Sequence, residues 1–475
     1  MAYAERPGGL SELARYGFVD LSGTMQKLDQ LVDLVGDSGR SAIASLAKSP
    51  DPDQALNALL GFAEADRSTI KSLLKREDSA TRLCQLLGAS AALTDFLRRQ
   101  PSCFAEFEKP VSTLDSAADL NRQLVQSVEP LLVAGFESQK VWTALRIEYR
   151  RQLLKVAIFD LSAADPQLAQ PVVAAALADL AGAAIEAGLR VARAELALST
   201  EFGVFDPREI DDTRLTVIAM GKCGARELNY ISDVDVIYVG QSANEAETSH
   251  QRAVEISTKL ATRMMRAMDG TAPEPGLWQV DPNLRPEGKS GALVRTLESH
   301  VSYYDRWAES WEFQALLKAR PLAGDMELGR EYVNALAPKV WASASRENFV
   351  ESAQRMRERV TEHIPADEVD RQIKLGPGGL RDIEFTVQLL QLVHGRTDDS
   401  VRQRDTLSAL EALTVAGYVG RFESAQFAQH YRFLRLLEHR IQLSNMRRTH
   451  LMPTSEVARR ALARSVNLKW TADEM

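Results

Sequence analysis

The chain contains little cysteine and little histidine. Its 475 residues include three cysteines and seven histidines. The cysteines, Cys84, Cys103 and Cys223, have neither the pairing pattern of a disulfide framework nor the spacing of a metal motif. We therefore expect reduced thiols in a cytoplasmic protein, and no zinc site.

The chain also lacks an excess of positive charge. Its net charge is −8 and its pI is about 5.6, which argues against a basic surface for nucleic acid. The mean hydropathy is −0.22, and we expect no apolar run to approach the length of a membrane span. The first residues, Met1–Pro7, lack the apolar stretch of a secretion signal. We expect neither nucleic acid nor membrane as a partner.

Apolar spacing and alanine content predict helices over most of the chain. A turn at Ser49–Asp53 offers Asp51 or Asp53 as a cap for the helix that follows. The predicted helices include Ser90–Leu97, Leu120–Leu145, the amphipathic Gln170–Leu198, Leu297–Ala319, Met326–Trp341, Phe349–Glu362, Gly378–His394, Leu407–Tyr418, Glu423–Met446 and Glu456–Val466.

Strand patterns occur only in the middle of the chain. They cover Leu215–Met220, Val234–Val239 and Leu277–Val280, with a helix at about Glu245–Met268 before the last of them. The expected fold is predominantly α, with a small embedded α/β domain and helical domains on either side. At this length several domains are expected, and we place them at residues 1–125, 126–325 and 326–475.

Two aspartates separated by one apolar residue mark the second strand. Because side chains alternate along a strand, Asp233 and Asp235 share one face, while Val234 and Val236 take the other. Paired carboxylates in an apolar setting repel each other unless a cation neutralises them. Oxygen ligands suit Mg²⁺ or Mn²⁺. A solvated strand end is the alternative reading of such a pair taken alone.

A third carboxylate follows the third predicted strand. Asp281 ends the apolar segment that begins at Leu277. A carboxylate on an adjacent strand would complete a site that binds divalent ions and a phosphate chain. We therefore predict Asp233, Asp235 and Asp281 as catalytic metal ligands.

Glycines and cations surround the predicted carboxylate site. Gly221 and Gly224 flank a turn that opens toward a helix, where exposed amides attract phosphate, although such a turn can also be purely structural. Ser232 either orients the site or ends a turn. Lys222, Arg226 and Arg285 would stabilise charge on a transferring phosphoryl group, or would be solvated or paired with Glu227 or Glu287.

The segment from Met220 to Val236 resembles the polymerase-beta-type nucleotidyltransferase superfamily. Gly221-Lys222, Gly224, Glu227-Leu228-Asn229 and Ser232-Asp233 resemble, more closely, the family of bifunctional glutamine synthetase adenylyltransferase/adenylyl-removing enzymes. Val280-Asp281, Leu284-Arg285-Pro286 and Ser290-Gly291 match a second block of that family. The resemblance implies a nucleotidyltransferase domain that uses Mg²⁺ or Mn²⁺.

A later block, Ile373–Phe385, is similar to that family's signature in the following helical domain. Lys374 and Arg381 within it are predicted to reach a phosphate, whereas Asp382 and Glu384 are predicted to have structural roles. The partners that the resemblance implies are adenylylated glutamine synthetase, a PII-type signal protein, inorganic phosphate, and ADP or ATP.

The family carries two nucleotidyltransferase copies, and this chain is expected to hold one. Glu227-Leu228-Asn229 and Arg381–Phe385 are similar to the adenylyl-removing, amino-terminal copy, which releases ADP by phosphorolysis. The chain ends in predicted helix, so we expect an excised fragment. Three alternatives remain open: the adenylylating copy, a PII uridylyltransferase, whose downstream HD-type region is absent here, and a non-catalytic module that binds nucleotide or PII.

Overall fold

The computed structural model describes residues 9–198, 205–345 and 364–467. The chain forms two compact units. The first contains Met1–Leu114, Leu153–Gln170 and Arg435–Met475, and the second contains Asp115–Gln152 and Pro171–Leu434. The boundary between them falls inside three helices, α9 (Ser138–Ser162), α10 (Pro166–Leu198) and α20 (Arg421–Asn445). The expected boundaries at residues 125 and 325 stay predictions.

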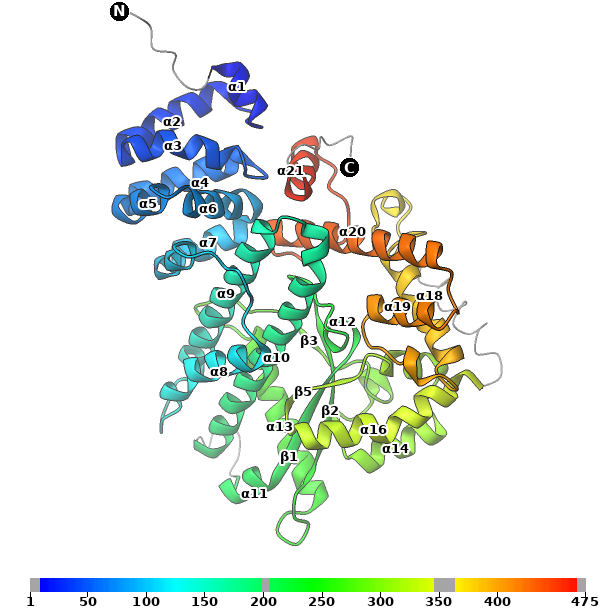
Figure 1. Cartoon of the computed structure of the whole chain (residues 1–475). Coiled ribbons are helices and arrows are strands. Elements are labelled where there is room, and N and C mark those ends of the chain that lie inside the picture. Colours follow the sequence, from blue (N-terminus) through cyan, green and yellow to red (C-terminus); the bar gives the residue numbers. More distant parts are fainter. Residues whose placement is uncertain (1–8, 199–204, 346–363, 468–475) are drawn as a thin grey trace, which may run out of the picture. The chain divides into compact units, whose positions relative to one another are not determined.

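Every regular element described in the first unit is a helix (Figure 1). Besides its parts of α9, α10 and α20, these are α1 (Leu10–Arg15), α2 (Leu21–Val35), α3 (Asp37–Leu46), α4 (Pro52–Ala65), α5 (Arg67–Leu74), α6 (Glu77–Ala89), α7 (Ala91–Arg99), the 3₁₀ helix η1 (Pro101–Phe107) and α21 (Glu456–Val466).

The cap expected before α4 is confirmed. The Asp51 side chain accepts a hydrogen bond from the Gln54 N–H at 2.9 Å, and Pro52 occupies the first helical position. Asp53 instead accepts from the Val19 N–H at 2.8 Å. Of the two candidate caps, Asp51 is therefore the one that starts the helix.

The second unit contains the sheet and most of the remaining helices. The helices are α8 (Ala117–Val128), η2 (Glu129–Leu131), α11 (Pro207–Asp212), α12 (Gly221–Gly224), α13 (His250–Asp269), η3 (Gly288–Ser290), α14 (Leu297–Arg306), α15 (Ser310–Leu316), α16 (Met326–Ala342), η4 (Ser343–Ser345), η5 (Val369–Arg371), α18 (Leu380–His394), η6 (Asp399–Val401) and α19 (Thr406–Val415).

The sheet is mixed and has five strands among the described residues. They are β1 (Thr213–Ala219), β2 (Val234–Ser242), β3 (Val280–Asp281), β4 (Val294–Arg295) and β5 (Arg320–Gly324). The order is β3-β2-β1-β5, and β4 also pairs with β2. β1 runs antiparallel to β2 and β5, whereas β3 and β4 run parallel to β2. Helices α13 and α16 pack on the sheet (Figure 1).

One apolar core lies on the face of the sheet that carries Ile218 and Ile237. Both side chains are fully buried in a cluster with Leu328 and Tyr332 of α16 and Phe313 of α15. Ile237 is two residues from Asp235 on β2, so the Asp235 face becomes apolar as soon as the strand passes the carboxylate. The core thus anchors the strand that bears the predicted site.

Most predicted elements are confirmed, with shifted ends, and the predominantly helical fold around a small mixed sheet is confirmed as well. The predicted strand Leu277–Val280 is wrong for its first three residues, because β3 covers only Val280–Asp281. The continuous helix over Leu120–Leu145 is wrong. Pro130 and Gly135, the latter at φ +77°, separate α8 from α9. Leu297–Ala319 is likewise two helices, α14 and α15. The predicted helix Phe349–Glu362 lies outside the described residues.

Helix α10 corrects the expectation about apolar runs. It is long and apolar enough to cross a membrane by length and composition alone, with a mean hydropathy of 1.7 over its most apolar window. That window is 72% buried inside the protein, so α10 is buried on nearly every side rather than amphipathic. Small alanine side chains permit this close packing. The absence of a membrane partner stays a prediction.

Candidate active site

The predicted metal ligands lie where β2 begins. Asp233 directly precedes the strand, and Asp235 is its second residue; both side chains are half-buried. In the parallel pairing of β2 with β3, Asp235 is in register with Asp281, and the buried Val234 is in register with Val280. Residues in register on neighbouring strands point to the same face. Asp235 and Asp281 therefore stand side by side.

Local contacts hold Asp281 and the segment that leads into β3. One Asp281 carboxylate oxygen accepts a hydrogen bond from the Asn283 N–H at 2.8 Å. Three residues before Asp281, the buried Trp278 indole donates to the Tyr149 hydroxyl of α9 at 3.0 Å. Because Trp278 is tied to α9, the position of the third aspartate depends on a helix well outside the sheet.

Gly221 begins the turn that follows β1, and this turn lies against the Asp235 carboxylate. Its φ is +52°, in the left-handed region. A β-carbon at this position would stand 2.6 Å from Asp235 Oδ2. The preceding Met220 N–H donates to the Asp235 carbonyl at 2.9 Å, which fixes the turn against β2.

Gly224 is the point of closest packing in the same turn. A β-carbon there would stand 2.0 Å from the Lys318 carbonyl oxygen and 2.6 Å from that of Ala219. The Arg320 guanidinium of β5 donates to the Gly224 and Cys223 carbonyls at 3.2 and 3.0 Å. These contacts give Gly224 a structural role. Phosphate binding by Gly224 and by Gly221 stays a prediction.

Arg226 and Arg285, both predicted to bind phosphate, have protein partners. Arg226 pairs with Asp179 of α10, with Nη2 and Oδ2 2.5 Å apart. The buried Arg285 donates to the carbonyls of Pro282, Lys289 and Gly291 at 2.9–3.2 Å, and this burial lowers its pKa. Arg285 thus closes the loop after β3.

Lys222 and Ser232 flank the aspartates in sequence. The Lys222 side chain is half-buried beside the Gly221 turn. The Ser232 hydroxyl donates to the Asp233 carbonyl at 2.9 Å, so its observed contact shapes the backbone before β2. The phosphate contacts predicted for Lys222, Arg226, Ser232 and Arg285 stay predictions.

Lys374 lies in the turn before α18, and Arg381 is the second residue of that helix. The Arg381 N–H donates to the Lys374 carbonyl at 3.0 Å, and the Asp382 carboxylate accepts from the Gly378 N–H at 2.8 Å. The Arg381 guanidinium lies 5.1 Å from the centre of the Phe385 ring, and burial lowers the pKa of Arg381. Asp382 therefore has the structural role predicted for it, while phosphate binding by Lys374 and Arg381 stays untested.

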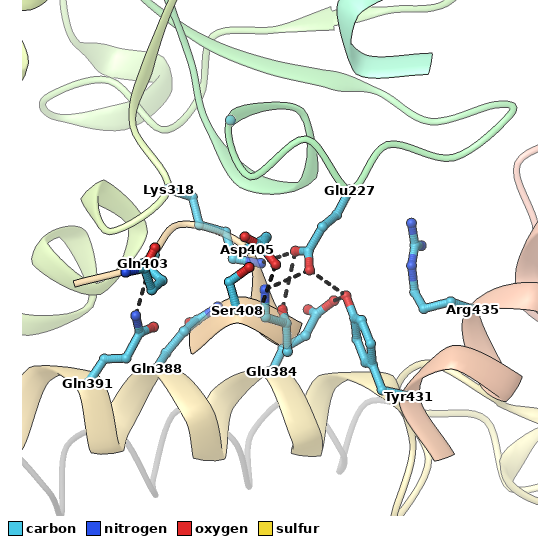
Figure 2. A network of polar contacts seen from close by, with 12 residues as sticks. Glu227, Lys318, Glu384, Gln388, Gln391, Gln403, Asp405, Ser408, Tyr431 and Arg435 are labelled. Carbon is cyan, nitrogen blue, oxygen red and sulfur yellow. Dashed lines mark hydrogen bonds and ion pairs between the residues drawn. The ribbon is translucent and has the colours of Figure 1, made fainter. Parts of the chain in front are cut away.

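The sequence alone does not predict the role of Glu227 as a buried carboxylate with several partners. The sequence suggests it as a partner for one of the nearby cations and as part of a family motif, yet its buried carboxylate pairs with Lys318 at 3.0 Å. The same carboxylate is contacted by Thr406 and by Tyr431, and Figure 2 shows the contact with Tyr431. Those partners lie 179 and 204 residues away in sequence. The flanking residues include Lys222, Arg226 and Asn229, so no local apolar pattern marks Glu227 as buried.

The buried thiol of Cys223 takes no part in this chemistry. Burial raises its pKa to about 12, so it stays protonated and weakly nucleophilic at neutral pH.

The three aspartates provide carboxylate oxygens for a divalent ion. In the described part of the chain, no group of three or more His, Cys, Asp or Glu side chains is gathered as a metal site. The donors are nonetheless all carboxylate oxygens, and the register places Asp235 beside Asp281. This pair fits a hard cation such as Mg²⁺ or Mn²⁺, with Asp233 adjacent to it.

Comparison with known proteins identifies the family. The sequence model of glutamate-ammonia ligase adenylyltransferase matches residues 80–335, more than half of the chain. The chain belongs to this family. A second model, GlnD PII-uridylyltransferase, matches residues 351–475. The three aspartates and Glu227 lie in the first matched region, and Lys374, Arg381 and Tyr431 lie in the second.

Several bifunctional glutamine synthetase adenylyltransferase/adenylyl-removing enzymes are similar to this adenylyltransferase-family chain. The enzyme of Leifsonia xyli is 54% identical over 469 residues, which cover 98% of this chain and 46% of the relative. Those of Streptomyces avermitilis and Streptomyces coelicolor are 46% and 45% identical, covering 98% and 99% of this chain and 45% of each relative. The chain therefore spans about half the length of the curated relatives it matches.

Proposed function

We propose that this chain removes AMP from the adenylylated tyrosine of glutamine synthetase by phosphorolysis. The observation that carries the proposal is the parallel register of Asp235 with Asp281 beside the Gly221 turn, in a chain similar to bifunctional adenylyltransferase/adenylyl-removing enzymes. The proposal includes a polymerase-beta-like nucleotidyltransferase fold for the sheet and its helices. Mg²⁺ or Mn²⁺ is the proposed cofactor.

The choice of the removing reaction is supported by sequence. Glu227-Leu228-Asn229 before Ser232-Asp233, and Arg381–Phe385 in the helical region, resemble the adenylyl-removing copy. Glutamine synthetase and a PII-type signal protein are the proposed protein partners. The match of residues 351–475 to a PII-uridylyltransferase model supports a PII-related role for the helices there.

In the proposed reaction an oxygen of inorganic phosphate attacks the α-phosphorus of the tyrosyl-AMP linkage. The bond from phosphorus to the tyrosyl oxygen breaks, ADP forms, and the tyrosyl oxygen takes up a proton. A divalent ion held by Asp233, Asp235 and Asp281 would neutralise charge on the phosphoryl oxygens and on the leaving oxygen. No other step is assigned to it.

The chain's own residues would orient the reactants. Lys222 is half-buried next to the Gly221 turn, and in this proposal its charge would bind the attacking phosphate. Arg285 would keep the loop after Asp281 in shape through its three carbonyl contacts. Arg226, paired with Asp179 and half exposed, would reach phosphate only by leaving that partner.

The proposal is tested by incubating the chain with adenylylated glutamine synthetase, Mg²⁺ and phosphate. Phosphorolysis predicts that the intact mass of each synthetase subunit falls by one adenylyl group while ADP appears in equal amount. Gain of AMP on unmodified synthetase with ATP would instead identify an adenylylating chain. Nucleotide or PII binding without either reaction would identify a sensor.

A further inference from the structure

Glu227 is a buried carboxylate that is surrounded by donors. It lies between the Gly221 turn and β2 and is 7% exposed. Its Oε1 accepts hydrogen bonds from the Thr406 N–H at 2.7 Å and the Tyr431 hydroxyl at 3.0 Å. Its Oε2 accepts from Lys318 Nζ at 3.0 Å and the Thr406 hydroxyl at 3.2 Å. A carboxylate removed from water requires this degree of compensation.

Two of the residues that donate to Glu227 come from helices remote in sequence. Thr406 is the first residue of α19. The backbone N–H groups in the first turn of a helix have no carbonyl partner within the helix, so this helix end favours a negative charge such as that of Glu227. Tyr431 belongs to α20, and its hydroxyl also lies 3.5 Å from Glu384 of α18. Figure 2 shows the Glu227 side chain reaching from its loop toward Tyr431 and Glu384. Two helices, α19 and α20, therefore donate to one carboxylate near the candidate site, and α18 is linked to it through Tyr431.

The backbone of Glu227 is tied to the Gly221 turn. Its N–H donates to the Lys222 carbonyl at 2.8 Å, and the Gly224 N–H donates to the Met220 carbonyl at 2.9 Å. The Met220 N–H in turn donates to the Asp235 carbonyl at 2.9 Å. These hydrogen bonds, with the short stretch of backbone between them, thus link Glu227 to the strand that carries Asp235.

We propose that Glu227 is a positioning residue through which α19 and α20 hold the Gly221–Gly224 turn against Asp235. Glu227 contacts no reacting atom in this role. Release of Tyr431 or of the Thr406 hydroxyl frees the turn while all three aspartates are kept. The effect on turnover rests on the proposed function, but the effect on the turn does not.

The test uses two substitutions with matched controls. Tyr431→Phe removes one donor and keeps the ring, and its control is Tyr332→Phe, which removes a buried hydroxyl in α16 that does not contact Glu227. Thr406→Val removes the hydroxyl donor, whereas Thr406→Ser retains it. Hydrogen exchange of the backbone amides in residues 221–232 is followed by mass spectrometry, together with the thermal midpoint of unfolding.

The proposal predicts that exchange in residues 221–232 is about tenfold faster in Tyr431→Phe and Thr406→Val than in the wild type. Tyr332→Phe and Thr406→Ser should retain wild-type exchange there. Unchanged exchange in residues 221–232 for both test variants would overturn the proposal. So would a rise confined to α19 and α20, because Glu227 would then serve only the packing of those helices.

Turnover provides a second and separate measurement. If the chain performs phosphorolysis, Tyr431→Phe should lower kcat about tenfold with little change in KM. An equal fall for Tyr332→Phe would contradict a specific positioning role. If the wild-type chain has no such activity, the proposed function fails, while the exchange experiment still decides the role of Glu227.

Discussion

The Asp235 carboxylate lies directly against the α-carbon of Gly221. A β-carbon on Gly221 would stand 2.6 Å from Asp235 Oδ2, and the residue has a φ of +52°. Two independent features therefore require glycine at position 221: the left-handed backbone angle and the carboxylate that occupies the space of a β-carbon. This contact places an anionic side chain against the start of the Gly221–Gly224 turn.

Gly221→Ala is predicted to damage the site more than the fold. Gly417 has a φ of +82° and open space around it, so Gly417→Ala is the matched control for backbone strain alone. Each substitution should lower the free energy of unfolding by about 1 kcal/mol in urea titrations. Only Gly221→Ala should also abolish phosphorolysis, because its methyl group displaces Asp235. Equal turnover in the two variants would contradict the role of that contact.

Asp233→Asn and Asp235→Asn are predicted to remove turnover and to preserve the fold. Each loses a negative charge but keeps its shape, and the loss of a metal ligand should lower kcat by a factor of about 100 or more. The control is Asp212→Asn, since Asp212 contacts Ser242 at the other end of β2 at 2.9 Å. Near-normal activity in either test variant, with intact circular dichroism, would refute the metal assignment.

The sequence was sufficient to predict β1, β2 and the carboxylates, because their signals are local. The alternation of buried and polar residues in these strands and the glycine turn between them occur within about twenty residues of one another. Strand β4 has two residues, and β5 begins with Arg320-Pro321, so neither carries a readable period. The partners of Glu227 depend on chain folding over about two hundred residues, which no local pattern encodes.

The predicted cations show the same limit. Arg226 and Arg285 were selected for their positive charge, which is visible in sequence. Their contacts with Asp179 and with three loop carbonyls depend on tertiary structure. The positive charges visible in the sequence therefore indicate where an anion is favoured, whereas the tertiary structure shows which of these cations already contact protein groups.

Lys318→Met is predicted to destabilise the protein strongly. The Lys318 and Glu227 side chains are 8% and 9% exposed, and loss of the lysine leaves a buried carboxylate without its cation. The free energy of unfolding should fall by about 3–5 kcal/mol, and the additional change Glu227→Gln should restore part of it. Lys339→Met, which breaks a more exposed pair with Asp305, should cost less than about 1 kcal/mol. Similar urea midpoints for the two lysine variants would refute this account.

His300 is predicted to make stability depend on acid. Its ring is buried beside Tyr332 and lies 3.4 Å from the Tyr238 carbonyl, and burial lowers its pKa from 6.5 to about 4. The unfolded chain then binds the proton more readily than the folded one. The stabilisation of the folded state by neutral His300 is therefore present above pH 6.5 and is lost as the pH falls toward 4. The free energy of unfolding should fall by about 3 kcal/mol in total over this range.

The pH effect is measured by comparing urea unfolding of the wild type with that of His300→Gln between pH 4 and 7. The wild type should lose about 1 kcal/mol more per pH unit than the variant between pH 6.5 and 4. Other titrating groups are common to both proteins and cancel in the difference. Parallel pH profiles would show that His300 is not held neutral by the fold.

The most direct test of the central claim follows labelled phosphate. The chain is incubated with adenylylated glutamine synthetase, Mg²⁺ and ³²P-phosphate, with Asp235→Asn alongside. Phosphorolysis at this site predicts labelled ADP in an amount equal to the adenylyl groups lost, and none with the variant. Release of AMP without label, or labelled ADP from both proteins, would contradict phosphorolysis at the carboxylate site.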